Sequence, residues 1–169
     1  MITEEDPLYE YAVGALGRRM RSVAEMKRLL RQRTEDSEIG HLLIDVVIAR
    51  LKQRGYLNDT QYATSFSSYR RDNEKLGRRR IVSELRARGV HAEVIEKTVE
   101  ETYGEVTESE QVRAYVRRKR LQKPKDQKQT ARIFRTLVRA GFGPRDIFAV
   151  LKQWDVDDET LSLLESETP

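Results

Sequence analysis

The chain has 169 residues, of which 38% are hydrophobic and 36% are charged, and it contains no cysteine. The lack of cysteine excludes disulfides, thiolate zinc sites and cysteine nucleophiles, and it fits a reducing cytosol. No apolar run approaches the ~18 residues of a membrane span, and the acidic start MITEEDPLYE has no apolar signal-peptide core. We therefore expect a cytoplasmic protein with a thin core and no membrane partner.

The formal net charge of +4 conceals a strong segregation of charge along the chain. Residues 111–145 contain twelve lysines and arginines and one acidic residue, whereas residues 93–110 contain seven glutamates and one lysine. Arginine outnumbers lysine by 23 to 9, and its planar guanidinium group suits forked contacts to phosphate or carboxylate. The basic stretch indicates a polyanionic partner. The alternative is the solvated surface of a charge-rich helical protein.

The first third of the chain predicts three helices, at about residues 7–20, 22–33 and 38–54. Apolar residues recur there at intervals of three and four, which is the spacing of an amphipathic helix. Ser22 and Glu25 are spaced as a capping box, in which each side chain accepts a free backbone N–H group at the start of a helix.

The middle third predicts three more helices, at about residues 59–73, 77–88 and 91–103. We expect Tyr56 and Leu57 to fill the core in the turn before them. Asn58 or Asp59 can cap the first of these helices, and Asp59 is the preferred candidate. Tyr62 lies on the same helical stripe as Phe66, and we expect both to pack in the core.

The last third predicts helices at about residues 107–121, 126–140 and 144–153. Thr107 and Glu110 have the spacing of a second capping box, and Pro144 suits a first helical turn. Trp154 is expected to cover the core behind the last helix. Residues 155–169 contain six acidic residues and no basic one, and we expect them to form an acidic C-terminal tail.

One spacing of residues occurs twice. Leu85, Gly89, Ile95 and Val99 are separated by the same intervals as a second set, Leu137, Gly141, Ile147 and Leu151. The unit is a helix that ends at glycine, followed by a second helix that packs back against it, and a weaker copy lies in the first third. The prediction is an all-α fold of three tandem three-helix repeats, at residues 7–57, 58–104 and 107–154, stacked into an elongated, curved array. Its radius of gyration should exceed the roughly 15–16 Å of a compact chain of this length.

Several segments resemble the RecX family. Residues 55–63, GYLNDTQYA, resemble its GYLDD-x-x-[FY]-A signature, and residues 76–90, LGRRRIVSELRARGV, resemble its KGPRRIRQEL-x-x-KGI stretch. Two outer segments, at residues 19–26 and 139–147, match further family motifs, so the resemblance covers about residues 8–153. Asn58 replaces an aspartate of the signature, Arg78 a proline, and Arg33 with Thr34 a Lys–Gly turn.

The resemblance implies a function without catalysis. RecX-like proteins are three tandem three-helix repeats that bind RecA, lie along the groove of the RecA–DNA filament, and restrain its extension, ATPase, strand exchange and coprotease activity. The family implies no cofactor. We therefore expect a non-enzymatic regulator, monomeric, with the RecA filament and single-stranded or duplex DNA as partners.

Two groups of basic residues are predicted to contact these partners. Arg78, Arg79 and Arg80 lie at a helix N-terminus, where free N–H groups and the helix dipole attract anions, and their mutual repulsion suggests an anionic partner. The second group lies on two later helices, the first of which carries bases on most faces and should be largely exposed. Its members are Arg113, Arg117, Arg118, Lys119, Arg120, Lys123, Lys125, Lys128, Arg132, Arg135 and Arg139.

No catalytic or metal site is predicted. His41 and His91 lie in different repeats, and the chain has no phosphate loop, HExxH or nucleophile motif. The glutamates at 93, 96 and 100 are interpreted as a solvated face rather than as metal-nuclease ligands. Two other functions stay open: a sequence-tolerant helical DNA-binding protein without a protein partner, and a helical-repeat adaptor that binds only protein.

Overall fold

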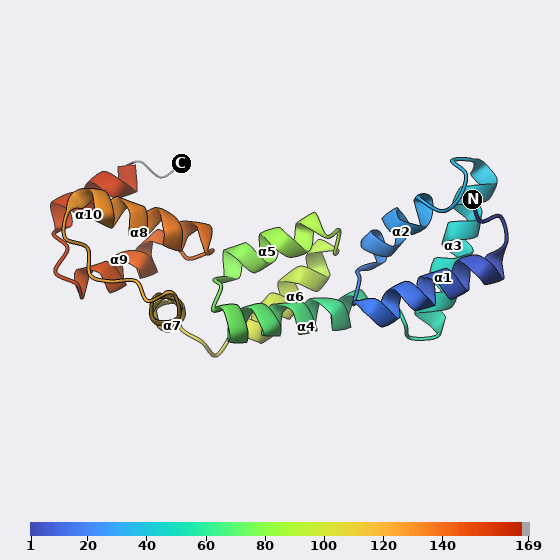
Figure 1. The fold of residues 1–169 in the computed structure, drawn as a ribbon. Coiled ribbons are helices and arrows are strands. Elements are labelled where there is room, and N and C mark those ends of the chain that lie inside the picture. The colour runs from blue at the N-terminus through green and yellow to red at the C-terminus, as the bar shows by residue number, and fades with distance from the viewer. Residues whose placement is uncertain (167–169) are drawn as a thin grey trace. The chain divides into compact units, whose positions relative to one another are not determined.

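The computed structural model describes residues 1–166, within which every regular element is a helix and no strand occurs (Figure 1). The all-α prediction is therefore confirmed. The α-helices are α1 (Glu5–Arg18), α2 (Val23–Arg31), α3 (Glu38–Gln53), α4 (Asp59–Tyr69), α5 (Arg78–Ala87), α6 (Ala92–Tyr103), α7 (Glu108–Lys119), α8 (Gln127–Arg139), α9 (Pro144–Lys152) and α10 (Asp158–Ser166). A π-helical turn, Arg70–Glu74, follows α4.

The chain divides into two compact units. Unit 1 comprises residues 1–65 and 85–98, and unit 2 comprises residues 66–84 together with the chain from residue 99 onward. Helices α4, α5 and α6 contribute residues to both units. The division into three repeats of three helices stays a prediction.

The core of unit 1 lies among α1, α2 and α3. Leu8, Met26, Leu30, Val47 and Leu51 are fully buried there. At the start of α2 the predicted capping box is confirmed: the Ser22 hydroxyl accepts the Glu25 N–H group at 3.1 Å, and the Glu25 carboxylate accepts the Ser22 N–H group at 3.0 Å.

Two predictions before α4 are wrong. The Asn58 side chain accepts the Gln61 N–H group at 3.0 Å, so Asn58 rather than Asp59 caps α4. Asp59 instead accepts the N–H group of Val23 at 2.8 Å, at the first residue of α2. Leu57 is buried as expected, but Tyr56 is 52% exposed, because successive side chains in this non-helical segment point in different directions and only one reaches the core.

The core of unit 2 lies among α7, α8, α9 and α10. Phe142, Leu137 and Ile147 are fully buried, and the ring of Phe142 meets that of Tyr115 edge-on with centroids 5.7 Å apart. Trp154 is half-buried and packs against this core, as predicted.

The C-terminal segment is more ordered than its acidic composition suggests. Within the predicted tail, Asp158–Ser166 form α10, whose Leu161 and Leu164 are each only 4% exposed. The two leucines are three residues apart and so share one helical face, which the composition alone conceals. The prediction of a tail is therefore wrong for α10, and residues 167–169 lie outside the described part of the chain.

The two predicted glycine turns are confirmed, because they have the same backbone conformation and the same hydrogen bond. Gly89 and Gly141 have φ values of 76° and 97°, a left-handed conformation that glycine adopts without steric cost. After α5, Val90 N–H donates to Leu85 O at 3.2 Å, and after α8, Phe142 N–H donates to Leu137 O at 3.3 Å. The two turns thus end their helices in the same way.

Candidate functional site

The N-terminus of α5 lies against the C-terminus of α8 within unit 2. Gly77 N–H donates to Ala140 O at 2.8 Å, and Arg79 N–H donates to Gly141 O at 3.2 Å. The prediction that these N–H groups are free to attract an anion is therefore wrong for these two groups. The carbonyl end of α8 carries partial negative charge, so it also offsets part of the repulsion among the three arginines.

The side chains of these arginines differ in their partners, although all three are exposed. Arg78 forms an ion pair with Glu100. Arg80 donates to Glu84 at 2.8 Å. Arg79 has no ion pair among the residues that the structure describes. Two of the three predicted contact residues are thus already neutralised by carboxylates, and Arg79 is the one that stays available for a partner.

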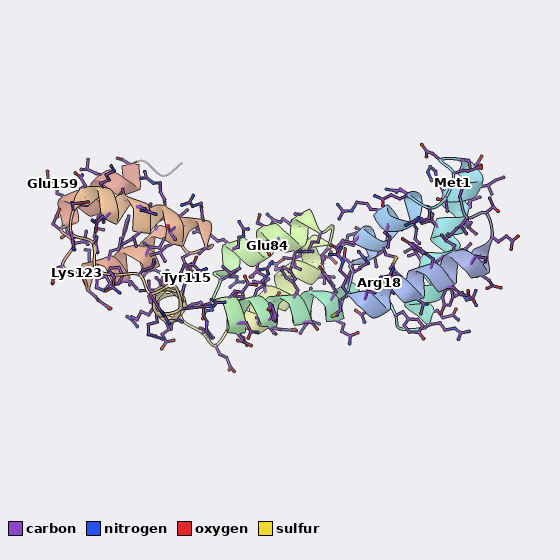
Figure 2. All side chains as sticks on the ribbon, viewed as in Figure 1. Met1, Arg18, Glu84, Tyr115, Lys123 and Glu159 are labelled. Atoms are coloured by element: carbon purple, nitrogen blue, oxygen red, sulfur yellow. The ribbon has the colours of Figure 1, made fainter. Side chains whose placement is uncertain are left out.

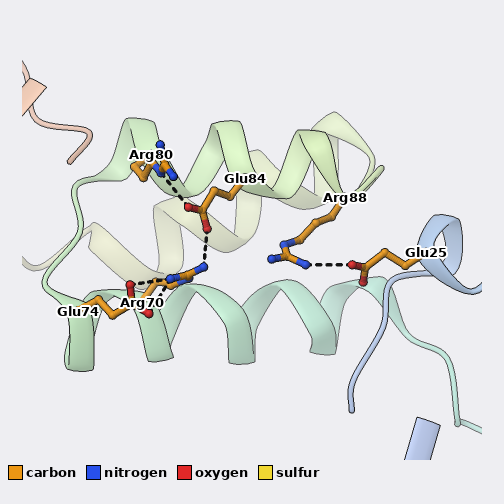
Figure 3. Close-up of polar contacts among 6 residues, drawn as sticks. All are labelled: Glu25, Arg70, Glu74, Arg80, Glu84 and Arg88. Carbon is orange, nitrogen blue, oxygen red and sulfur yellow. Dashed lines mark hydrogen bonds and ion pairs between the residues drawn. The ribbon is translucent and has the colours of Figure 1, made fainter. Parts of the chain in front are cut away.

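Glu84 links Arg80 to the π-helical turn. Its side chain is only 16% exposed and accepts Arg80 on one oxygen, while its other oxygen lies 3.0 Å from an Arg70 nitrogen (Figure 3). Arg70 also contacts Glu74 at 2.6 Å. Figure 3 shows a separate pair within unit 1, Arg88 with Glu25, at 2.9 Å. These ion pairs hold the Arg80 side chain against Glu84, so Arg80 has a structural role in addition to carrying charge on the surface.

Helix α7 has one buried face and a basic C-terminal turn. Val112, Tyr115 and Val116 are buried in the core of unit 2. The prediction that this helix is largely exposed is therefore wrong. Arg113 is half-buried, whereas the four basic residues at the end of the helix are exposed, where cations interact favourably with the helix dipole. They are Arg117, Arg118, Lys119 and Arg120.

Tyr115 lies on α7 in unit 2 (Figure 2), where the charges of arginines from three helices act on its hydroxyl. Burial raises the pKa of Tyr115, and the charges of Arg118, Arg139 and Arg80 oppose that rise because each stabilises the phenolate. Lys119 lies 5.8 Å from the centre of the same ring. We call Arg80, Arg118 and Arg139 the arginine cluster. The sequence predicts a contact role for each of the three arginines separately and none for Tyr115.

Helix α8 carries a row of exposed arginines, Arg132, Arg135 and Arg139, which we call the α8 stripe. All three point away from the buried Phe134 and Leu137, as their spacing predicts. None of the three forms an ion pair within the described chain. The stripe is therefore a row of uncompensated positive charge.

The remaining predicted residues fall into two classes. Lys123 is paired with Asp155 at 2.6 Å, and Arg118 donates to the backbone carbonyl of Asn73. Lys125 and Lys128 are exposed and have no ion pair in residues 1–166. The stripe and these two lysines belong to a cationic surface of unit 2 that has no ion pair in residues 1–166. It also includes the exposed Arg79, Arg117, Lys119, Arg120 and Arg145.

Residues 1–166 lack two other kinds of feature. No cluster of histidine, aspartate and glutamate there could hold a metal ion. No helix in the same range has the length and apolar character needed to cross a membrane.

Comparison with known proteins identifies the family. The family model described as RecX, second three-helix domain, matches residues 58–99. The chain is 34% identical over 148 residues to the regulatory protein RecX of Pseudomonas putida KT2440, covering 87% of this chain and 90% of that protein. It belongs to the RecX family. It is also 30% identical over 153 residues to the regulatory protein RecX of Deinococcus radiodurans, covering 89% of this chain and 69% of that one.

The RecX fold is shared as well. A crystal structure of RecX from Lactobacillus salivarius superposes with a TM-score of 0.69 at 20% identity, covering 88% of this chain and 95% of that one. The RecX relatives carry the name of regulatory proteins rather than of enzymes. The match to the second RecX domain includes Arg78, Arg79 and Arg80, whereas the α8 stripe lies outside it.

Proposed function

We propose that this RecX-family protein regulates the RecA recombinase in the cytoplasm, by binding RecA filaments assembled on DNA. It mainly inhibits filament extension, ATPase, strand exchange and coprotease activity, without a cofactor or catalysis of its own. The α8 stripe is the observation that carries the proposal, because its three arginines are exposed and have no acidic partner in the described chain. The name of the relatives, regulatory protein RecX, supports regulation rather than catalysis.

The geometry of the stripe suits a phosphate backbone or an acidic protein surface. Arg132 and Arg139 are seven residues apart and are therefore separated by about 10 Å along the helix, enough to face several successive phosphates of one strand. Guanidinium groups bind such anions through forked hydrogen bonds. Lys125 and Lys128 add positive charge, but a lysine ammonium group cannot form the forked pair of hydrogen bonds that a guanidinium group forms.

The arginine cluster gives the surface a second component. The charges of Arg80 and Arg118 act on Tyr115 together with the charge of Arg139, the last residue of the stripe. Arg80 is paired with Glu84, and Arg118 donates to the Asn73 carbonyl, so both side chains are already held within unit 2. We propose that the stripe, rather than these two arginines, makes the direct contacts to the filament.

The test is the ATPase of RecA on single-stranded DNA, measured with and without this protein. We expect the rate to fall at stoichiometric or lower ratios, and the protein alone to hydrolyse no ATP. Heat-unfolded protein at the same concentration is the control for nonspecific effects. An unchanged RecA rate, together with retained binding to DNA alone, would replace this proposal with the sequence-tolerant DNA-binding function.

The DNA-binding alternative rests on the same exposed arginines. Filter binding of the protein alone to single-stranded and duplex DNA measures it, with steep salt dependence as the mark of phosphate contacts. A protein that affects RecA yet binds no DNA would be contacting RecA only, as an adaptor does.

A further inference from the structure

Helix α3 carries an apolar stripe that faces away from the core of unit 1. Ile39 is 77% exposed, Leu42 61% and Val46 48%, and the exposed Ala49 continues the row. The buried side of the same helix is formed by other residues, Ile44, Val47, Ile48 and Leu51. Single exposed apolar side chains are common on soluble proteins, but a contiguous row of them marks an interaction surface.

The spacing of this row is that of a helix-pairing seam. Positions 39, 42, 46 and 49 are separated by three, four and three residues, which are the intervals between the a and d positions of a heptad repeat. The seam runs over most of the 16 residues of α3. The seam therefore fits another helix lying alongside α3 better than it fits an extended peptide or a small molecule.

The charges that flank the seam are divided between its two ends. Asp36 and Glu38 stand at the N-terminal end, and Arg50 and Lys52 stand at the C-terminal end. Asp36 contacts His41 at 3.0 Å, and Arg50 contacts Glu5 and Asp6 on α1. Glu38 and Lys52 are exposed and have no ion pair in the described chain. An acidic end and a basic end on one helix are complementary to the same helix running in the opposite direction.

We infer that α3 pairs antiparallel with α3 of a second copy of this chain. When Leu42 lies opposite Val46 of the second copy, Ile39 lies opposite Ala49, and Glu38 faces Lys52. A two-fold axis repeats each contact, as in an isologous dimer. A parallel pair would instead bring the two acidic ends together. The inference revises the expectation of a monomer and is independent of the proposed function, because α3 lies wholly in unit 1.

One like-charge contact lies at the centre of this pair. Asp45 flanks the seam and would approach Asp45 of the second copy. Its carboxylate is bound to Lys27 at 2.7 Å, and this ion pair keeps the pKa of Asp45 below its ordinary value. The repulsion is therefore offset by the two lysines. Since a seam of four small-to-medium apolar residues buries less than a standard interface of about 800 Å² per partner, the dimer should be weak and concentration-dependent.

Sedimentation velocity over a range of protein concentrations tests the inference with a charge-swap design. Glu38→Lys and Lys52→Glu should each weaken dimerisation, because each places like charges at both ends of the seam. The double variant Glu38→Lys/Lys52→Glu restores opposite charges and should dimerise as wild type does. An equimolar mixture of the two single variants should form a mixed dimer, since each chain then faces the opposite charge.

The apolar seam is tested by Leu42→Gln/Val46→Gln. This variant should weaken dimerisation by about 100-fold or more, because both copies lose apolar burial. Leu163→Gln, which changes a 49% exposed leucine on α10, is the matched control and should leave the dimer intact. A wild-type protein that stays monomeric throughout, or a dimer that the seam variants do not change, overturns the inference. So does a monomer whose seam variants abolish RecA-filament binding, since the filament would then be the occupant.

Discussion

Tyr103 makes a buried polar contact that can be isolated by a single substitution. Its hydroxyl donates to the carbonyl of Leu76 at 2.7 Å, and its side chain is 8% exposed. Tyr103→Phe should lower the free energy of unfolding by about 1 kcal/mol, because it leaves that carbonyl unpaired. Urea denaturation followed by circular dichroism measures the loss, and no change would mean that water replaces the hydroxyl.

The same residue predicts how stability depends on pH. Burial raises the pKa of Tyr103 above its ordinary value of 10.0, so the folded state keeps a proton that the unfolded state releases above that value. The stability contributed by the neutral phenol is thus fully present below pH 10 and is lost as pH rises beyond it. The difference between wild type and Tyr103→Phe should therefore stay constant up to about pH 9 and shrink as pH rises above about pH 10. A constant difference would contradict the assignment.

The glycine turn after α8 is required for the contact with α5. An added Cβ at Gly141 would lie 2.4 Å from the backbone nitrogen of Arg80, and the residue has a φ of 97°. Gly141→Ala should therefore destabilise the protein by about 2 kcal/mol or more. Gly14→Ala is the control: Gly14 lies within α1 with nothing near its added Cβ, and the change should stabilise by up to about 1 kcal/mol. Thermal unfolding of both variants should shift in opposite directions.

Contacts between residues that are close in the chain could be predicted from the sequence, whereas contacts between distant residues could not. The capping box of Ser22 and Glu25 and the turn at Gly141 involve partners within five residues, so sequence spacing defines them. The donation from Arg79 N–H to Gly141 O joins residues far apart in the chain, and no sequence pattern signals it. For the same reason the sequence predicted contacts for Arg80, Arg118 and Arg139 but could not show that their charges all act on Tyr115.

The packing of α10 against the core of unit 2 depends mainly on two leucine side chains. Leu161 and Leu164 are each 4% exposed in the core of unit 2, so Leu161→Ala and Leu164→Ala should each cost about 2–4 kcal/mol. Leu163→Ala on the same helix should cost no more than about 0.5 kcal/mol, because Leu163 is 49% exposed. Equal losses from all three substitutions, measured by urea denaturation, would show that helix propensity rather than packing holds α10.

The prediction of helices was most successful where apolar periodicity is strong. The nine expected helices all have counterparts among α1 to α9, and their boundaries moved by one to a few residues. The failures, α10 and the buried face of α7, share a cause. In both segments a high density of charge drew the interpretation toward solvent, although a few apolar residues at intervals of three and four were enough to anchor the helix in a core.

At the scale of the whole molecule, unit 1 and unit 2 are assigned separate tasks. The seam of α3 in unit 1 is proposed to join two copies, whereas the α8 stripe in unit 2 is proposed to bind the filament. The stacking of three repeats into an elongated array stays a prediction from the sequence. Since the seam and the stripe share no residue, substitutions in one should leave the function of the other unchanged, and each proposal can fail without the other.

The most direct test of the central claim is binding to preassembled RecA–single-stranded DNA filaments, measured by cosedimentation as a function of salt. Arg132→Glu/Arg135→Glu/Arg139→Glu should weaken binding by about 100-fold or more and reduce the salt slope by about 2, with little change in thermal unfolding. Arg28→Glu/Arg31→Glu/Arg86→Glu makes the same change of net charge at exposed positions of unit 1 and should retain most of the binding. If the stripe variant stays folded and binds filaments as wild type does, the account of the α8 stripe is wrong.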